Sequence, residues 1–473
     1  MNRWMLFCLV LFLHFPMLPV TGQDVVNEYD KITDIIQSLH TFSQSIPQEK
    51  VYLHFDNTSY YQGDNIWFKC YVVTPGLHQL SGLSKTLYVE LLNPGGEIID
   101  KRILKIEDGQ CHGDFSLTQL PFYSGFYEVR AYTRYMLNFG EDVIFSRMFP
   151  VFDAPKTEGD FEEKRILNFG RWGIRNYPVK RASPQKGKNV NLHFYPEGGN
   201  LIQGIASIVA FEATDENGVP IAVAGTVMDA DKQPLSDIKT IHEGRGVFTY
   251  KPRGGKQNDI AEVDYNGRKY RFDMPTALPQ GVVMEVDNLS CADSINITLR
   301  KTIDTPSEML GVTVINGGSL HNYCGAYIVE NELHFRLDKT QLPSGVSQIV
   351  LFNNMGEIVC DRLIFNNRNR KLLDIKVQTG KSFYQPYELV DMEFSIADSD
   401  DIPENLSFSL SIRDGANEVE SNHNIMTDLL LMSEIKGYVR NPYWYFEGDD
   451  DARSAALRVS SSSASKYQCG FRT

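Results

Sequence analysis

The sequence contains none of the short motifs that mark common enzyme active sites. No HExxH, GxSxG, GxxxxGKS/T or strand-following GxGxxG pattern occurs in its 473 residues, so the corresponding hydrolase and nucleotide-binding classes find no support. Lys/Arg-rich blocks are also missing, and 60 acidic residues against 46 basic ones give a net charge of −14. This balance argues against a nucleic-acid partner or a basic membrane-binding patch. The sequence predicts a protein that is not an enzyme and has no catalytic, cofactor-binding or metal-ligating residues.

Cysteine pairs of the CxxC type are absent as well. Seven cysteines occur, and six follow the N-terminal region: Cys70, Cys111, Cys291, Cys324, Cys360 and Cys469. Their wide spacing does not resemble a zinc site. Two interpretations of Cys70 and Cys111 stay open, a disulfide within one domain or two small side chains filling a core.

Only the N-terminus has a long apolar run. Arg3 precedes a continuous apolar stretch at residues 4–15, and two prolines then lead to small residues before Gly22. This pattern predicts a signal peptide at 1–22, while the alternative, an uncleaved anchor, needs a longer run. We expect the mature chain to have no membrane span and to reside in the periplasm or on the outer-membrane surface.

A helix is predicted immediately after the signal peptide. Apolar residues recur at steps of three and four over residues 23–46, and Pro47 follows. Such spacing is typical of an amphipathic helix. We expect it to pack on the first folded domain, with binding to a partner as the alternative.

Beyond Pro47 the apolar period changes to two. Short aromatic and β-branched runs alternate with turn signals such as NPGGE at 93–97 and Asn217-Gly218, a pattern typical of antiparallel sandwiches. With 42% hydrophobic residues, the chain can fill several cores. We predict sandwiches at 47–154, 189–278, 279–368 and 369–456, with a solvated linker at 155–188.

One phrase occurs twice in the chain. SYYQGDNIWFK at 59–69 and SFYQPYELVDMEF at 382–394 share an aromatic residue, Tyr-Gln and an acid. Gly permits a positive φ in the first copy, and Pro fixes φ in the second. Repetition at this distance predicts two copies of one type of domain.

The C-terminal part differs from the rest. NIMTDLLLMSEIKG predicts a buried helix at 424–436, capped by Asn424 and ended by Gly437. A strand is expected at 406–414. The serine-rich residues 457–473 predict a disordered tail.

Several polar or aromatic groups are weak site candidates. His54 with Asp56, and Cys111-His112 with Asp114, have the spacing of metal half-sites, but residues two apart share a face on any strand. The acidic groups at 398–404 and 447–451 are better interpreted as solvated turns. Aromatic residues 443–446 fit packing on the preceding helix better than a stacking surface. Asp293-Ser294-Ile295 matches an O-glycosylation pattern only weakly.

The phrases EKVYLHFDNTSYYQGDNIWFKCYVV, LPFYSGFYEVRAYTRYMLNFG and NIMTDLLLMSEIKGYVRNPYWYF resemble macroglobulin-type sandwiches of the alpha-macroglobulin superfamily. More narrowly, they resemble long secreted proteins of gram-negative bacteria that often continue into regions like TonB-receptor plugs. The resemblance covers most of residues 47–456. It implies an all-β fold of tandem macroglobulin-like (Ig/fibronectin-like) sandwiches with a short helix near each end. It also implies that both copies of the repeated phrase build the turn at the start of a strand.

Two departures from the resemblance limit the function. The Cys-x-Glu-Gln thioester motif is missing, which excludes covalent trapping of proteases. The family pattern also stops at Leu457, as expected of a frameshifted or C-terminally truncated reading frame, with a natural tail as the alternative. The resemblance implies a non-catalytic binding or structural module with a protein partner at the outer membrane. The alternative is a non-covalent endopeptidase inhibitor, with residues 156–188 as the candidate bait.

Overall fold

The computed structural model describes most of the chain between the N-terminal helix and the last helical turns. The described residues are 22–118, 123–157, 164–170, 173–178, 189–254, 259–367, 375–385, 387–396, 407–413, 419, 421, 423–435, 439 and 441–447. The predicted signal peptide (apart from Gly22), the acidic residues at 398–404 and the tail at 457–473 lie outside them. Most of the candidate bait segment does so too.

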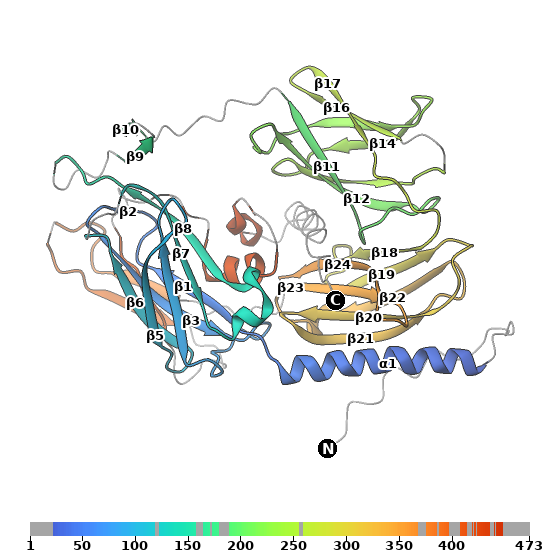
Figure 1. The fold of residues 1–473 in the computed structure, drawn as a ribbon, viewed down its shortest axis with the longest axis horizontal. Coiled ribbons are helices and arrows are strands. Elements are labelled where there is room, and N and C mark those ends of the chain that lie inside the picture. Colours follow the sequence, from blue (N-terminus) through green and yellow to red (C-terminus); the bar gives the residue numbers. More distant parts are fainter. Residues whose placement is uncertain are drawn as a thin grey trace.

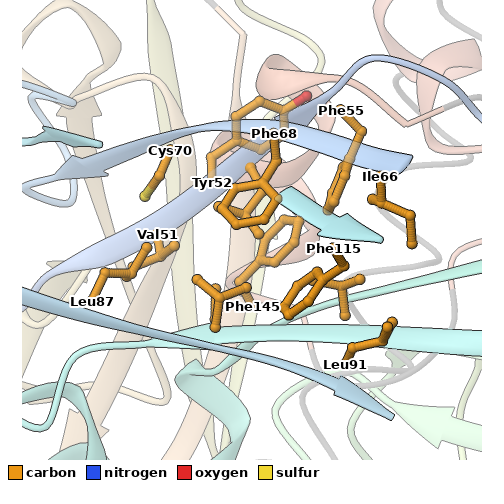
Figure 2. Packing of buried hydrophobic residues seen from close by; sticks show 14 of the residues in the cluster. Val51, Tyr52, Phe55, Ile66, Phe68, Cys70, Leu87, Leu91, Phe115 and Phe145 are labelled. Carbon is orange, nitrogen blue, oxygen red and sulfur yellow. The ribbon is translucent and has the colours of Figure 1, made fainter. Parts of the chain in front are cut away.

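The first sandwich consists of two antiparallel sheets that enclose an aromatic core. One sheet has the order β1-β3-β6, from Lys50–Phe55, Asn65–Val73 and Gln110–Ser116. The other has the order β2-β8-β7-β4-β5, from Tyr60–Tyr61, Phe145–Phe152, Gly125–Tyr132, Thr86–Leu92 and Ile98–Lys105. Figure 2 shows Phe55, Phe68, Phe115 and Phe145 between the sheets. Short 3-10 helices η1 (Met136–Phe139) and η2 (Glu141–Val143) precede β8.

The second and third sandwiches follow along the chain. The second contains sheets β11-β12-β15 and β14-β13-β16-β17, from Val190–Pro196, Ser207–Asp215, Arg245–Tyr250, Pro234–Lys239, Ala224–Met228, Ile260–Tyr265 and Arg268–Asp273. The third contains β18-β19-β22 and β21-β20-β23-β24, from Val282–Asp287, Ser294–Lys301, Glu332–Asp338, Ser319–Tyr327, Met309–Asn316, Gly345–Phe352 and Ile358–Asn366. The 3-10 helix η3 (Lys339–Gln341) precedes β23.

All three sandwiches have one strand order. With the two-residue strand β2 left aside, the seven strands of each unit form a sheet in the order first-second-fifth and a sheet in the order fourth-third-sixth-seventh. The paired sheets enclose separate cores in each unit. This repetition confirms the predicted fold class, an all-β chain of tandem antiparallel sandwiches.

The predicted turns have the expected chemistry. In the NPGGE turn the Asn93 side chain accepts the N–H groups of Gly95 and Glu97, and Gly96 has a φ of 82°. In the second sandwich, Asp215 accepts the N–H groups of Asn217 and Val219. Asn and Asp side chains fix tight turns in this way.

The repeated phrase builds the same turn twice. In the first copy Asp64 N–H donates to the carbonyl of Tyr61, and its carboxylate accepts Tyr61 N–H at 2.8 Å. In the second copy Glu388 N–H donates to the carbonyl of Gln385, and the Glu388 carboxylate accepts Gln385 N–H at 2.8 Å. The third turn residue has positive φ in each, 97° at Gly63 and 66° at Tyr387. Both turns precede a strand, as predicted.

The N-terminal helix α1 (Gly22–Ser45) contacts a different sandwich from the one expected. Ile32 and Ile36 pack with Met309 and Phe352 of the third sandwich, and Figure 1 shows α1 along its β20–β21 side. Glu28 also accepts the N–H of Met309 at 3.1 Å. The prediction that this helix packs on the first sandwich is wrong. Proximity in sequence suggested that partner, but the apolar face of a distant sheet provides the matching surface.

The remaining described elements belong to the predicted linker and the C-terminal part. Strands β9 (Arg165–Gly170) and β10 (Gly173–Pro178) form a two-stranded sheet within the predicted linker. Strands β25 (Ile375–Thr379) and β26 (Met392–Ile396) pair after the third sandwich. Residues 407–413 belong to no strand in the described chain, so the strand expected there is wrong over these residues. The hydroxyl of Ser409 instead contacts His54 and Tyr71 of the first sandwich.

Candidate functional site

The C-terminal helical turns connect the three sandwiches. They comprise α2 (Ile425–Thr427), the π-helical turn η5 (Asp428–Met432) and the 3-10 helix η6 (Pro442–Phe446). Asn424 caps α2 in a reciprocal pair of hydrogen bonds with Thr427, as the sequence predicted. Figure 1 shows these red turns between the blue first sandwich and the orange sheet of the third. Residues of these turns line the cavity that forms the candidate site.

Each face of these turns contacts a different sandwich. Leu429 belongs to the core of the first sandwich, and Leu431 packs on Val346 and Leu363 of the third. Trp444 stacks on His242 of the second, with ring centroids 3.8 Å apart. The aromatic residues at 444–446 also pack against the helical turns, in agreement with the packing interpretation.

A cavity of about 830 Å³ lies between these turns and one margin of the first sandwich. Its walls include residues 48–51 at the start of β1 and residues 142–150, which end within β8. The C-terminal part contributes Val419, Ser421, His423, Asp428, Leu429, Met432, Ser433, Glu434, Asn441 and Pro442. Strand β1 is the outermost strand of its sheet, and β8 is flanked on its outer side only by β2. Two sheet margins therefore face one space.

Strand β8 presents unpaired main-chain groups to this cavity. Within the described chain, β2 covers only Val151 and Phe152 of β8. The carbonyl of Phe152 accepts Gln62 N–H at 2.9 Å, so the main-chain groups of residue 152 point away from β7. Because these groups alternate in direction along a strand, those of Ser146 and Met148 point the same way. This margin of β8, residues 145–150, is called the β8 edge below.

Two ion pairs fix the C-terminal turns beside the β8 edge. Arg147 pairs with Asp428, and Lys50 pairs with Glu434. Lys50 also donates to the hydroxyl of Ser433 at 2.8 Å. Burial raises the pKa of Asp428, and the positive charge of Arg147 opposes that shift only in part. Burial likewise raises the pKa of Tyr52 to about 12, so its phenol is neutral at physiological pH.

His423 makes the cavity wall sensitive to acid. Burial lowers its pKa to about 4, and the charge of Arg147 acts in the same direction. The folded state therefore binds fewer protons than the unfolded state between about pH 4 and pH 6.5. The contribution of His423 to the free energy of unfolding is therefore fully present above pH 6.5 and decreases as pH falls toward 4. The pKa of Asp428 is raised, so the contribution of this group to the free energy of unfolding decreases as pH rises above the usual aspartate pKa.

We expect His423→Gln to lose less stability on acidification than the unmodified chain, because it removes one group that must become charged. Urea midpoints at about pH 7 and about pH 4.5 measure the difference for each protein. His334→Gln is the control, since His334 is exposed and hydrogen-bonds to Thr298 far from the cavity. Equal acid-induced losses in His423→Gln and the unmodified chain would contradict the expectation.

The sequence-predicted metal half-sites lie on neighbouring strands of one sheet, where Lys69 of β3 is opposite both His54 and His112. His54 contacts Ser409, whereas Asp56 accepts the hydroxyl of Tyr60 and the N–H of Trp67. Cys111 faces Cys70 across β3 and β6. The described residues contain no cluster of three or more His, Cys, Asp or Glu side chains arranged to hold a metal ion. Among the same residues, no helix has the length and apolarity needed to cross a membrane.

Sequence reasoning missed the cavity residues. Arg147 and Asp428 are 281 positions apart, and no sequence pattern links the two positions. The only local signal was the helix cap at Asn424, which located the helical turns but not their partner.

No family model matches the chain, and no curated protein matches it. Solved structures overlap with it weakly. Salmonella alpha-2-macroglobulin reacted with methylamine is 10% identical, with 74% of this chain and 25% of that chain covered and a TM-score of 0.19. Escherichia coli alpha-2-macroglobulin activated by porcine elastase is 10% identical, with 70% of this chain and 32% of that chain covered and a TM-score of 0.22. Dimeric latent PorU from Porphyromonas gingivalis is 12% identical, with 67% of this chain and 34% of that chain covered and a TM-score of 0.26.

This chain spans about a quarter to a third of the length of these proteins. At such TM-scores the superpositions define no shared whole-chain arrangement. The assignment to the tandem-sandwich class depends on the sheets of this chain itself.

Proposed function

We propose that this chain is a non-catalytic, exported binding module that holds an extended, basic polypeptide segment along the β8 edge. The observation that carries the proposal is the set of main-chain groups of Ser146 and Met148 that face the 830 Å³ cavity. An extended peptide can add to such an edge as a further strand, with hydrogen bonds to the main chain and no rearrangement of the core.

The charge of the cavity wall supports a basic ligand. Among the described residues of the wall, two cations, Lys50 and Arg147, occur with four carboxylates: Asp142, Glu243, Asp428 and Glu434. The carboxylate of Glu49, which also lines the cavity, accepts the hydroxyls of Ser81, Ser84 and Thr133. Both cations are already paired with wall carboxylates. An incoming lysine or arginine side chain therefore meets a negative field, whereas an acidic peptide is repelled.

Export and association with an outer-membrane assembly are further parts of this proposal. They are supported by the apolar N-terminal run before Gly22 and by the macroglobulin-type phrases. A binding role agrees with a wall built from ion pairs and main-chain groups.

The test is fluorescence anisotropy with two labelled peptides, one of alternating Lys and Val and one of alternating Glu and Val. We expect the basic peptide to bind, and its affinity to fall as salt is added because the attraction is screened. Met148→Pro removes the outward N–H of the β8 edge, where proline is compatible with an edge strand. This variant should bind the basic peptide roughly tenfold more weakly.

Met148→Ala is the matched control, because it shortens the exposed side chain and keeps the N–H. It should bind as the unmodified chain does. Circular dichroism verifies that both variants retain the sheets. Equal binding of the two peptides, or full binding by Met148→Pro, would refute the proposal.

A further inference from the structure

Two cysteine side chains meet inside the first sandwich. Cys70 of β3 is directly opposite Cys111 of β6 in the antiparallel register. Both are buried, at 0% and 8% exposure, and their thiols are close enough to hydrogen-bond. Figure 2 shows Cys70 directed into the core beside Val51 and Leu87. The two sulfur atoms therefore share one space between the sheets.

The backbone hydrogen bonds define the separation of these two residues. Val72 N–H donates to the carbonyl of Gly109 at 2.8 Å, and Leu117 N–H donates to the carbonyl of Asp64 at 2.8 Å. Both bonds belong to the register that pairs Cys70 with Cys111. Because hydrogen-bonded pairs alternate along an antiparallel ladder, the cysteine pair is of the hydrogen-bonded kind, with Cα atoms about 5.5 Å apart. This Cα separation lies within the range that disulfides span, and closing the bond requires the two Cβ atoms to approach to about 3.8 Å.

We propose that Cys70 and Cys111 form a disulfide when the chain meets a thiol–disulfide oxidant, such as oxidised glutathione. The Cys111 thiolate attacks one sulfur of the oxidant, whose S–S bond breaks to release one glutathione thiolate. Cys70 then loses its proton and attacks the sulfur of Cys111, displacing the second glutathione. The two protons released by the cysteines go to the two glutathione thiolates, so two cysteines are oxidised and one glutathione disulfide is reduced.

The exposure and pKa of the two thiols indicate that Cys111 is the one that attacks the oxidant first. Cys111 is the more exposed of the two, and the hydrogen bond from Cys70 lowers its pKa, with Lys69 adding to the effect. Burial raises the pKa of Cys70, which suits it to the second, internal step. This is the order in which the more exposed thiolate reacts before the more deeply buried partner resolves the mixed disulfide.

The described strand registers place no second cysteine opposite Cys324 or Cys360. Cys291, Cys324 and Cys360 belong to the third sandwich, and the strand residue opposite Cys324 is Val312. Burial raises the pKa of the Cys360 thiol, which makes it a poor nucleophile. Among the described cysteines, only the pair in the first sandwich therefore has a disulfide-compatible register.

The bond would restrain both sheets of the first sandwich. The loop it closes contains about 40 residues and includes β4 and β5 of the opposite sheet. A disulfide that closes a loop of this length lowers the conformational entropy of the unfolded chain and so stabilises the folded state. We expect the oxidised protein to unfold at a Tm roughly 5–15 °C above that of the reduced protein.

The experiment uses the full chain, unfolded in urea with all thiols reduced and refolded in a glutathione redox buffer. Refolding makes both sulfurs accessible, so burial cannot prevent the reaction. Free thiols are then blocked with N-ethylmaleimide and the digest is analysed by mass spectrometry. We expect a linked peptide containing Cys70 and Cys111, neither alkylated, and the same link in the Cys360→Ser control.

Two results would overturn the proposal. One is recovery of the native circular dichroism spectrum while Cys70 and Cys111 are both alkylated. The other is a digest in which either cysteine is linked to a different one. The outcome is independent of peptide binding, because the cysteines lie in the core and the proposed ligand site is the β8 edge.

Discussion

Arg362→Met is expected to lower the free energy of unfolding by about 3–5 kcal/mol, because it leaves a buried carboxylate without its cation. Arg362 Nε lies 3.2 Å from Glu197 Oε1, and the two side chains are 3% and 2% exposed. Glu197 belongs to the second sandwich and Arg362 to β24 of the third. The measurement is the midpoint of urea unfolding, with intrinsic fluorescence and circular dichroism as the two probes.

The double variant Glu197→Gln with Arg362→Met separates charge from shape. It removes both charges and keeps an oxygen near Val286, whose N–H donates to Glu197 at 3.1 Å. We expect it to regain most of the lost stability, because the main cost of the single change is the uncompensated charge. If the double variant were as unstable as Arg362→Met, the loss would come from packing and not from the ion pair.

Leu431→Ala is expected to cost about 2–5 kcal/mol, since it removes a side chain from a closed apolar cluster and leaves a cavity. Leu431 is 1% exposed and packs with Val346, Leu363 and Ile435. The change weakens the attachment of the C-terminal turns to the third sandwich. Thermal unfolding measures the loss of stability, and limited proteolysis measures how readily the turns detach.

The matched control is Leu389→Ala. It is the same chemical change at a side chain that is 79% exposed, so its effect should be close to zero. Similar losses in the two variants would show that Leu431 does not hold the turns in place.

The predictions that succeeded depended on local chemistry. The two copies of the repeated phrase form the same turn because an acid three residues after the first turn residue bonds back to it, as Asp64 does to Tyr61 and Glu388 does to Gln385. The cap at Asn424 and the NPGGE hairpin are also short-range features. Alternating apolar residues likewise identified the sandwich strands. All of these depend on neighbours within a few positions.

The predictions that failed concerned surfaces that meet across the chain. The apolar spacing of Ile32 and Ile36 identified α1 correctly but did not specify a partner, and Met309 and Phe352 provide it. The β8 edge became a site only when the C-terminal turns brought Asp428 to Arg147. No periodicity encodes such matches, because they depend on the shape and charge of surfaces formed after the strands have paired.

The position of α1 has a consequence for the order of events during synthesis. Its apolar stripe emerges from the ribosome early, but Met309 and Phe352, which cover it, are made more than 270 residues later. The helical turns that contact all three sandwiches are made later still. Each sandwich can fold as its own seven strands appear, whereas their mutual arrangement is completed last. The apolar stripe of this segment therefore stays without its covering sheet until the third sandwich has been made.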